Sequence, residues 1–530
     1  MCGIAVAINW DCAAITVRGM IDGILHRGDT TDPIISPAER TAMSTRRLRV
    51  VDPAGGIQPK ASSDGRLLVS FNGEIYNHRE LRSELETLGI PFFTDSDTEV
   101  LANALSVWGA TALTRLIGMY AFVAYDLKTN EFLAARDPHG VKPLYVVQSG
   151  EAFLFCSEIR PLLDAAPLGD VMFLPPGHLL MKGLCMKFYT PPACEKSQEH
   201  SVQRLDAVLD NAVGSRLPTG LVAPVLFSGG IDSTLVLHYA RRHRSNTPAY
   251  FIGNDDAPDL RFARAYADLT KADFRQVKFD PLQSDILALL EKVVEVTESF
   301  EPSVVQAGLY TYLLSRQIHD DGYRVALCGE GADELFAGYA PIEHIYSHSE
   351  EAGRNSQEQC IAHMHRSNLQ RLDRCGMRWG LEVREPFLDG SIIAYSRNLS
   401  RETLIKTVNG LPQGKQPLRE IYDQYPEQLP AVIRHRHKLV FSEGAGIGSE
   451  RAIWRQQFEE FISDCEFEVG KREFAEYELN TKEELFYLRA LSRKLDITRV
   501  PHLKGRLRLY VPPDLAPMPT EMTCLLRDAA

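Results

Sequence analysis

The sequence predicts an α+β domain followed by an α/β domain with a mostly parallel sheet and a helical C-terminal part. The chain has 530 residues, which is more than one hydrophobic core usually holds, and chains of this length form about two to three domains. Short strand-like runs dominate before residue 190, whereas strands alternate with helices after residue 200. A polar, proline-containing segment at 191–200 separates the two patterns and is expected to be a linker.

In the first domain, apolar runs bounded by turn residues favour strands, which are expected at 4–8, 67–71, 120–125 and 153–156. Helical patterns lie among them at 77–88 and 98–107, and Ser96-Asp97 can cap the second helix. Strands with flanking helices indicate an α+β layered domain over 1–190. Asn72-Gly73 is typical of a turn, so we expect the strand that starts at 67 to end there.

In the second domain, strands are expected at 222–227, 249–252 and 324–327, and helices at 202–216, 259–269 and 306–318. This alternation indicates a mostly parallel sheet. We expect the domain to span 201–503, with mostly helical structure toward its end. Residues 504–530 are expected to form a loosely tethered tail.

The composition excludes several classes of protein. A net charge of −12 argues against nucleic-acid binding, which normally requires a basic domain. Ten cysteines without C-x-x-C spacing indicate reduced thiols. No apolar run approaches the roughly 18 residues of a membrane span, and the N-terminus does not resemble a signal peptide. We therefore expect a cytoplasmic protein with no membrane or nucleic-acid partner, and the sequence leaves a homodimer open.

Cys2 follows the initiator methionine and is a candidate nucleophile. Removal of the methionine would leave a free α-amine, which titrates near about 7.7–8.0 and can act as general base for the thiol of the same residue. A cysteine near a terminus is more often incidental, but other residues supply what acyl transfer needs. Asn72 and Gly73 offer donors for an oxyanion. Arg47 can bind a carboxylate and Asp97 an ammonium group, which together describe a free α-amino acid.

These residues lie in motifs that resemble the class II glutamine amidotransferases over about the first 190 residues. The motifs are Met-Cys-Gly-Ile at 1–4, His-Arg-Gly at 26–28, Phe-Asn-Gly-Glu-Ile-Tyr-Asn at 71–77, Ser-Asp-Thr-Glu at 96–99 and the segment 136–145. The resemblance implies an Ntn-type αββα sandwich, with Cys2 as nucleophile and Asn72 and Gly73 as oxyanion hole. It also implies a glutamine site formed by Arg47, Asn72, Gly73, Glu74 and Asp97. Within the motifs, Arg27, Arg136 and Asp137 are explained equally well as structural ion pairs.

The sequence Ser-Gly-Gly-Ile-Asp-Ser at 228–233 lies between a predicted strand and a predicted helix. Its glycines let the backbone wrap closely around an anion, and the N–H groups at a helix N-terminus favour phosphate. Asp232 is a candidate Mg²⁺ ligand. The spacing is not that of a Walker P-loop. It is similar to the pyrophosphate loop of the ATP pyrophosphatases, which activate a substrate as an acyl-adenylate.

Two further clusters are candidates for the same site. The segment 328–339 places Glu330 and Asp333 among glycines at the end of a predicted strand, where metal and substrate chemistry is common. Arg436 and Lys438 can stabilise a leaving pyrophosphate, although 434–438 taken alone is typical of a solvated basic patch.

Taken in this order, the three clusters resemble the asparagine synthetase family, and the resemblance extends over roughly 1–495. It implies that Asp232 and Asp333 bind Mg²⁺ and that Glu330 handles protons when ammonia attacks. It implies an ATP and pyrophosphate site formed by Leu226, Ser228, Gly229, Gly230, Asp232, Ser233, Ile252, Cys328, Gly329 and Lys438. The small-molecule partners are then glutamine, ATP and an acceptor carboxylic acid.

The acceptor is the least specified part. Ser303, Val304 and Gln306 stand where one branch of the family carries paired threonines and an arginine suited to aspartate, and glutamine lacks that charged fork. Aspartate, with asparagine as product, is the favoured prediction, and a different acid of specialised metabolism is the alternative. A non-catalytic paralogue is a third hypothesis, which the intact candidate residues disfavour.

Overall fold

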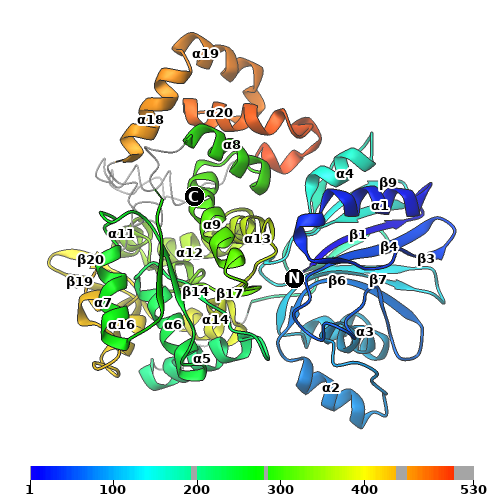
Figure 1. Cartoon of the computed structure of the whole chain (residues 1–530), viewed down its shortest axis with the longest axis horizontal. Helices are drawn as coiled ribbons and strands as arrows, with labels where there is room; N and C mark the ends of the chain where they lie inside the picture. Colours follow the sequence, from blue (N-terminus) through cyan, green and yellow to red (C-terminus); the bar gives the residue numbers. More distant parts are fainter. Residues whose placement is uncertain (1, 192–199, 280–284, 437–449, 506–530) are drawn as a thin grey trace. The chain divides into compact units, whose positions relative to one another are not determined.

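A computed structural model describes residues 2–191, 200–279, 285–436 and 450–505, and the chain divides into two compact units (Figure 1). The first unit contains Met1–Thr190, Asp373–Glu382 and Ala490–Gly505. Among the described residues, the second contains those of Pro191–Leu372 and Val383–Arg489. Two segments from late in the sequence thus belong to the unit that carries Cys2.

The first unit contains two antiparallel sheets. The first sheet has the order β11-β9-β10-β1-β4-β2, with β3 also paired to β4: β1 Cys2–Ile8, β2 Thr30–Thr31, β3 Ile35–Ala38, β4 Thr41–Arg47, β9 Tyr145–Ser149, β10 Ala152–Cys156 and β11 Met172–Phe173. The second sheet has the order β13-β12-β8-β7-β6-β5: β5 Lys60–Ala61, β6 Leu67–Ile75, β7 Gly118–Asp126, β8 Phe132–Arg136, β12 His178–Met181 and β13 Leu184–Lys187.

Helices cover the outer faces of both sheets (Figure 1). Helices α1 (Ala13–Gly23) and α4 (Ile159–Ala165) pack on the first sheet, and α2 (His78–Thr87) and α3 (Asp97–Trp108) lie on the side of the second. Ser96 caps α3, as predicted, because its side chain accepts a hydrogen bond from the Thr98 N–H. This arrangement confirms the predicted αββα sandwich.

Alternate residues of β6 and β7 contribute to two different cores. Leu68 and Val123 pack between the two sheets, whereas Val69, Phe71 and Phe122 pack beneath α2 and α3. Successive side chains of a strand point to opposite faces, so a strand buried on both faces needs apolar residues at nearly every position. This explains the continuous apolar runs of the first domain.

The predicted turn at Asn72-Gly73 is wrong. Both residues lie inside β6, which pairs with β7 along its whole length, with Asn72 opposite Ala121 and Gly73 opposite Tyr120. Glycine is needed here for another reason. Its φ is +156°, and a Cβ would lie 2.1 Å from the Met119 carbonyl oxygen, so the residue serves a close approach of strands rather than a turn.

The second unit contains a five-stranded sheet in the order β16-β15-β14-β17-β18: β14 Val225–Leu226, β15 Ala249–Ile252, β16 Phe274–Val277, β17 Val325–Leu327 and β18 Glu382–Arg384. The pairs of β14 with β15, β14 with β17 and β15 with β16 are parallel, which confirms the predicted sheet. The chain adds β15 and β16 on one side of β14 and then returns to place β17 on the other side. The strand order therefore reverses between β14 and β17, where open α/β sheets bind ligands.

Helices account for most of the rest of this unit, which confirms the helical C-terminal part. They are α5 Val202–Arg216, α6 Ile231–His243, α7 Leu260–Thr270, α8 Ile286–Thr297, α9 Pro302–Asp320, α10 Ala332–Leu335, α11 Ala340–His348, α12 Glu350–His363, α13 Asn368–Met377, α14 Gly390–Arg397, α15 Arg401–Leu404, α16 Gln416–Tyr422, α17 Ala431–Arg434, α18 Glu450–Phe461, α19 Asp464–Glu473 and α20 Lys482–Ser492. A small hairpin, β19 (Lys406–Val408) and β20 (Leu411–Gln413), interrupts them. None of the helices in the described part of the chain is long and apolar enough to span a membrane.

Candidate active sites

Cys2 is the first residue of β1 and is buried, with 6% of its surface exposed. Its backbone N–H donates a hydrogen bond of 2.9 Å to Oδ1 of Asn72. The Asn72 amide is thereby oriented with its oxygen toward Cys2, and its buried Nδ2 has no hydrogen-bond partner in the described structure. An unused buried donor beside a nucleophile suits a charge that develops only during a reaction.

Burial raises the pKa of the Cys2 thiol to about 11, and the charge of Glu382 adds to this rise. The thiol is therefore protonated at neutral pH and needs a base before it can attack.

Two of the predicted glutamine-binding residues already have partners. Cys2 and Arg47 are paired across β1 and β4, and Arg47 donates to Asp32 Oδ2 at 3.0 Å and to the Pro53 carbonyl at 3.1 Å. Asp97 accepts a hydrogen bond of 3.1 Å from the Ile75 N–H. Burial raises the pKa of Asp97 to about 6.

The remaining predicted residues of this site, Gly73 and Glu74, follow Asn72 in β6, and Glu74 is buried. The structure therefore brings Cys2, Arg47 and Asn72 together through strand pairing and one hydrogen bond.

Arg136 and Asp137 have structural partners. Arg136 donates to the carbonyl oxygens of Gly140, Lys142 and Leu174. The Asp137 carboxylate accepts hydrogen bonds from the backbone N–H groups of His139, Val141 and Lys142. Both residues stabilise a tight loop after β8.

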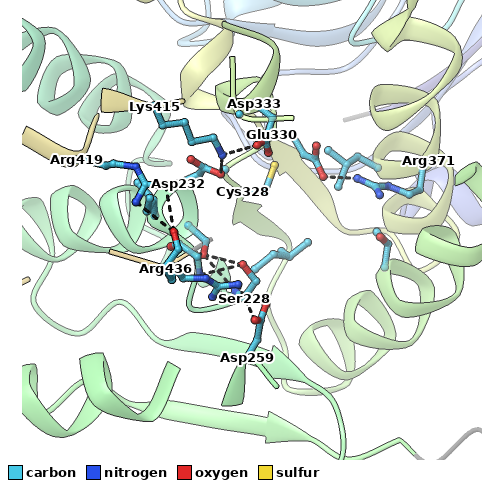
Figure 2. Close-up of a pocket in the computed structure, with 18 of the residues that line it drawn as sticks. Ser228, Asp232, Asp259, Cys328, Glu330, Asp333, Arg371, Lys415, Arg419 and Arg436 are labelled. Carbon is cyan, nitrogen blue, oxygen red and sulfur yellow. Dashed lines mark hydrogen bonds and ion pairs between the residues drawn. The ribbon is translucent and has the colours of Figure 1, made fainter. Parts of the chain in front are cut away.

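The second unit has a cavity of about 100 Å³ at the carboxyl ends of β14 and β17 (Figure 2). Its walls are Leu226, Ser228, Gly230, Ile231, Asp232, Ser233, Asp259, Thr311, Cys328, Gly329, Glu330, Asp333, Gly338, Glu343, Arg371, Leu372, Lys415, Arg419 and Arg436. Most of the residues predicted from the segments 228–233 and 328–339 line this cavity. Gly229, Ile252, Ser303 and Gln306 do not line this cavity, and Lys438 lies outside the described residues.

The loop at 228–233 is closed by its own side chains. Ser233 Oγ accepts from the Ser228 N–H at 3.2 Å, and Ser228 Oγ accepts from the Gly230 N–H at 3.3 Å. Gly229 has φ +70°, and a Cβ there would lie 2.5 Å from the backbone nitrogen of Ala263, so only glycine fits. The loop leads directly into α6, whose N-terminal N–H groups favour an anion.

Lys415 holds the two predicted metal ligands together. Its Nζ lies 2.6 Å from Asp232 Oδ2 and 2.5 Å from Asp333 Oδ1, and all three side chains are largely buried (Figure 2). Gly338 leaves room for this group, because a Cβ there would lie 2.0 Å from Lys415 Cε. The two carboxylates thus face one cation.

A metal ion can use the same carboxylates. Among the described residues, no group of three or more His, Cys, Asp or Glu side chains is arranged to hold a metal. Mg²⁺, however, commonly takes only one or two carboxylates together with phosphate oxygens. Asp232 and Asp333 fit that requirement in number and type.

Three further cations reach the cavity from separate elements. Arg436 pairs with Asp259 at 2.6 Å and donates to the Gly229 carbonyl at 2.9 Å, and Arg371 forms an ion pair with Glu330. Arg419 follows Lys415 by one helical turn on α16. Lys415, Arg419 and Arg371 were not identified from the sequence, because isolated basic residues in helical segments look like solvated surface charges.

The predicted acceptor residue Gln306 points elsewhere on α9. Thr311 lines the cavity, and Gln306 precedes it by five residues, which places it about 140° around the helix. Gln306 Nε2 donates to Glu483 Oε1 at 2.7 Å, and Glu483 also accepts from the Tyr487 hydroxyl at 2.8 Å. The three side chains form a buried polar cluster between α9 and α20.

The chain is similar in sequence to known proteins over both of its parts. A family model described as "Glutamine amidotransferase domain" matches residues 1–173, and one described as "Asparagine synthase" matches 204–360 and 346–499. The glutamine-hydrolysing asparagine synthetase of Zea mays is 31% identical over 93% of this chain and 86% of its own length. A nodule asparagine synthetase of Pisum sativum is 33% identical over 84% and 79%. A probable asparagine synthetase of Dictyostelium discoideum is 30% identical over 92% of each chain.

The chain belongs to the glutamine-hydrolysing asparagine synthetase family. The resemblance stated from the motifs is thereby confirmed. As a member of this family, the chain is an enzyme of the ligase class, an ATP-dependent amidotransferase.

Proposed function

We propose that this enzyme hydrolyses glutamine at Cys2 and uses the ammonia to amidate a carboxylate that ATP has activated as an acyl-adenylate. One observation carries the proposal: the chain contains both a buried N-terminal cysteine beside an unused amide donor and a cation-rich cavity at the switch point of a parallel sheet. Each arrangement suits one half of the reaction.

In the glutaminase half, the Cys2 sulfur attacks the side-chain amide carbon of glutamine, and the carbon–nitrogen bond breaks to release ammonia. Water then hydrolyses the thioester to glutamate and restores the thiol. After removal of Met1, the α-amine of Cys2 takes the thiol proton and then gives it to the leaving nitrogen, so that ammonia departs. Asn72 Nδ2 and the Gly73 N–H stabilise the oxyanion, which is supported by the unused Asn72 donor.

Binding of glutamine is assigned to Arg47, Glu74 and Asp97, with Asn72 and Gly73 at the amide. The glutamine carboxylate competes with Asp32 for Arg47, or binds beside Asp32 at the remaining Nη2. Asp97 binds the α-ammonium as a carboxylate.

In the synthetase half, the loop Ser228–Ser233 binds the ATP phosphates, together with the adjoining residues Leu226, Ile252, Cys328 and Gly329 predicted for the nucleotide. Asp232 and Asp333 would hold Mg²⁺, which would neutralise phosphate charge. Lys415, which contacts both carboxylates, lies beside the position proposed for the metal ion. Lys438 is assigned to pyrophosphate, and Glu330, held by Arg371, to proton transfer as ammonia attacks.

For the acceptor we propose aspartate, with asparagine as product. The proposal is supported by the names of the relatives, which are asparagine synthetases. A second candidate is a different carboxylic acid, and one observation favours it. Gln306 bonds to Glu483, so this position offers a neutral amide and a buried carboxylate rather than a guanidinium that could bind a second carboxyl group.

The test is to incubate purified full-length protein with ATP, Mg²⁺ and glutamine, and to measure pyrophosphate release with aspartate and with a panel of other acids. Aspartate-dependent pyrophosphate and asparagine are expected in equal amounts. Glutaminase activity without any aspartate-dependent pyrophosphate would overturn aspartate as acceptor and support the second candidate.

We also propose a cytoplasmic location. The eight cysteines in the described part of the chain are free thiols, which suits a reducing compartment.

A further inference from the structure

Side chains of the first unit hold the backbone of Cys2 on both sides. Its N–H donates to Asn72, and its carbonyl oxygen accepts a hydrogen bond of 3.2 Å from Arg27 Nε. The Arg27 side chain is completely buried. Arg27 therefore orients the first peptide of β1 and, with it, the thiol of Cys2.

The Arg27 guanidinium is itself fixed at all three nitrogens. Besides the bond from Nε to Cys2, Nη1 donates to Glu158 Oε1 at 2.9 Å and Nη2 donates to Asp373 Oδ1 at 3.0 Å. A planar guanidinium whose three nitrogens are all engaged cannot rotate without breaking a bond. The direction of the bond to Cys2 thus depends on the two carboxylates.

The two carboxylates are not equivalent. Glu158 is shared, because His26 at 2.9 Å and Arg374 at 3.0 Å also contact it. Asp373 is 2% exposed and pairs with Arg27. The pKa of the Arg27 guanidinium is raised, although its burial acts to lower it, because the charges of Asp373 and Glu158 outweigh the burial.

Asp373 lies far from Cys2 in the sequence, on α13, at the start of the segment Asp373–Glu382 that belongs to the first unit. Glu382, at the other end of this segment, is fully buried, and its charge adds to the rise in the pKa of both Cys2 and Asp97. The segment therefore acts on the glutaminase site at two points.

We propose that the segment Asp373–Glu382 completes the glutaminase site, with Asp373 as a positioning residue that acts on Cys2 through Arg27. The inference rests on the proposed glutaminase function of Cys2. It means that residues 1–190 do not contain the whole of the glutaminase machinery, although every residue predicted for that site lies within them.

The experiment compares Asp373→Asn with the wild type as full-length proteins. Asparagine keeps the shape and one acceptor but removes the charge that fixes Arg27. A shift of the thiol by about 1 Å costs on the order of 10²-fold in rate, so kcat for glutamine hydrolysis is expected to fall by up to that factor. The KM for glutamine is expected to stay within about twofold, because Arg47 and Asp97 are unchanged. Asp373→Glu, which restores the charge, is expected to recover most of the loss.

A matched control removes a different ion pair of the same unit. Asp126→Asn breaks the contact of 2.7 Å with Arg66, and is expected to leave kcat and KM for glutamine unchanged. Activity with added ammonia in place of glutamine reports on folding of the second unit, and is expected to persist in all three variants.

The outcomes separate this inference from the function on which it rests. Wild-type protein without glutaminase activity would overturn the proposed function itself. Active wild type with an unchanged kcat in Asp373→Asn would overturn the positioning role alone. A parallel loss of glutamine-dependent and ammonia-dependent activity, or failure of Asp373→Glu to recover, would show that Asp373 is merely structural and would also overturn it.

Discussion

Around Cys2, the candidate catalytic atoms belong to backbone groups and short side chains on paired strands. Around Asp232, several charged groups lie at the ends of long side chains, those of Arg371, Lys415 and Arg436, which reach the cavity from separate helices and loops. Strand pairing fixes atoms without help from a ligand. Ion pairs between long side chains exchange partners when a charged substrate arrives. We therefore expect the glutaminase site to be sensitive to small backbone changes, and the synthetase site to changes of charge.

The largest expected effect tests whether the two sites are separable. Cys2→Ala should reduce glutamine-dependent product formation by about 10⁴-fold or more, because the nucleophile is lost. Activity with added ammonia should remain. Cys12→Ala, which removes an exposed free thiol, is the control and should have no effect. Simultaneous loss of both activities in Cys2→Ala would contradict a two-site enzyme.

Lys415→Met tests the charge dependence of the second site. It leaves Asp232 and Asp333 facing each other without the buried cation, which should lower the free energy of unfolding by about 3–5 kcal/mol. Pyrophosphate release should fall by about 10²–10³-fold, while glutamine hydrolysis without ATP persists. The control is Lys406→Met, whose pair with Glu420 is half exposed and worth about 0–1 kcal/mol. Chemical denaturation and a pyrophosphate assay measure both effects, and equal stability of the two variants would contradict the prediction.

Gly73→Ala tests the backbone dependence of the first site. The added Cβ would meet the Met119 carbonyl oxygen and push β6 away from β7, so glutamine hydrolysis should fall on the order of 10²-fold. Gly19→Ala in helix α1 of the same unit has open space around the new Cβ and should be neutral or stabilising by about 0.5–1 kcal/mol. Steady-state kinetics with glutamine would distinguish the two variants. Equal activity would mean that the strand contact is not needed.

The smallest expected effect concerns pH. Since burial raises the pKa of Asp97 to about 6, its carboxylate is lost as the pH falls through 6, and the KM for glutamine should rise up to about tenfold per pH unit below that value. Because the pKa of Asp97 in the folded protein lies above the ordinary Asp value, protonation of Asp97 stabilises the fold. Loss of stability through Asp97 therefore does not explain the rise in KM at low pH. Asp97→Asn should show a high KM for glutamine that does not change between pH 7 and pH 5. A KM of the wild type that is constant over the same range would contradict the assignment.

Much of the fold was predictable because its signals are local. The helix at 202–216 and the strand at 249–252 have the predicted bounds, since periodicity and flanking turn residues determine such elements. The strand at 222–227 is shorter, Val225–Leu226, and Asn72-Gly73 lies within a strand because pairing with β7 overrides its turn preference. Local chemistry of this kind cannot predict the strand partners Ala121 and Tyr120, which lie 49 and 47 residues further along the chain.

The candidate sites divide in the same way. Motifs of adjacent residues, such as the loop at 228–233, were found because their chemistry is complete within a few positions. Lys415 and Arg371 were not found, because each is a lone basic residue in a helical region until the fold places it beside a carboxylate. The membership of Asp373 in the unit of Cys2 likewise has no local signal.

The sequence by itself determined the fold class of each part, the candidate nucleophile Cys2 and the family. All of these depend on residues close together in the chain. Only the tertiary structure decided that Lys415 neutralises Asp232 and Asp333, and that Gln306 faces Glu483. It also decided that Arg27 connects Cys2 to Asp373. The physical reason is that charge pairing acts through space over a few ångströms, so it joins residues whose separation in the sequence carries no information.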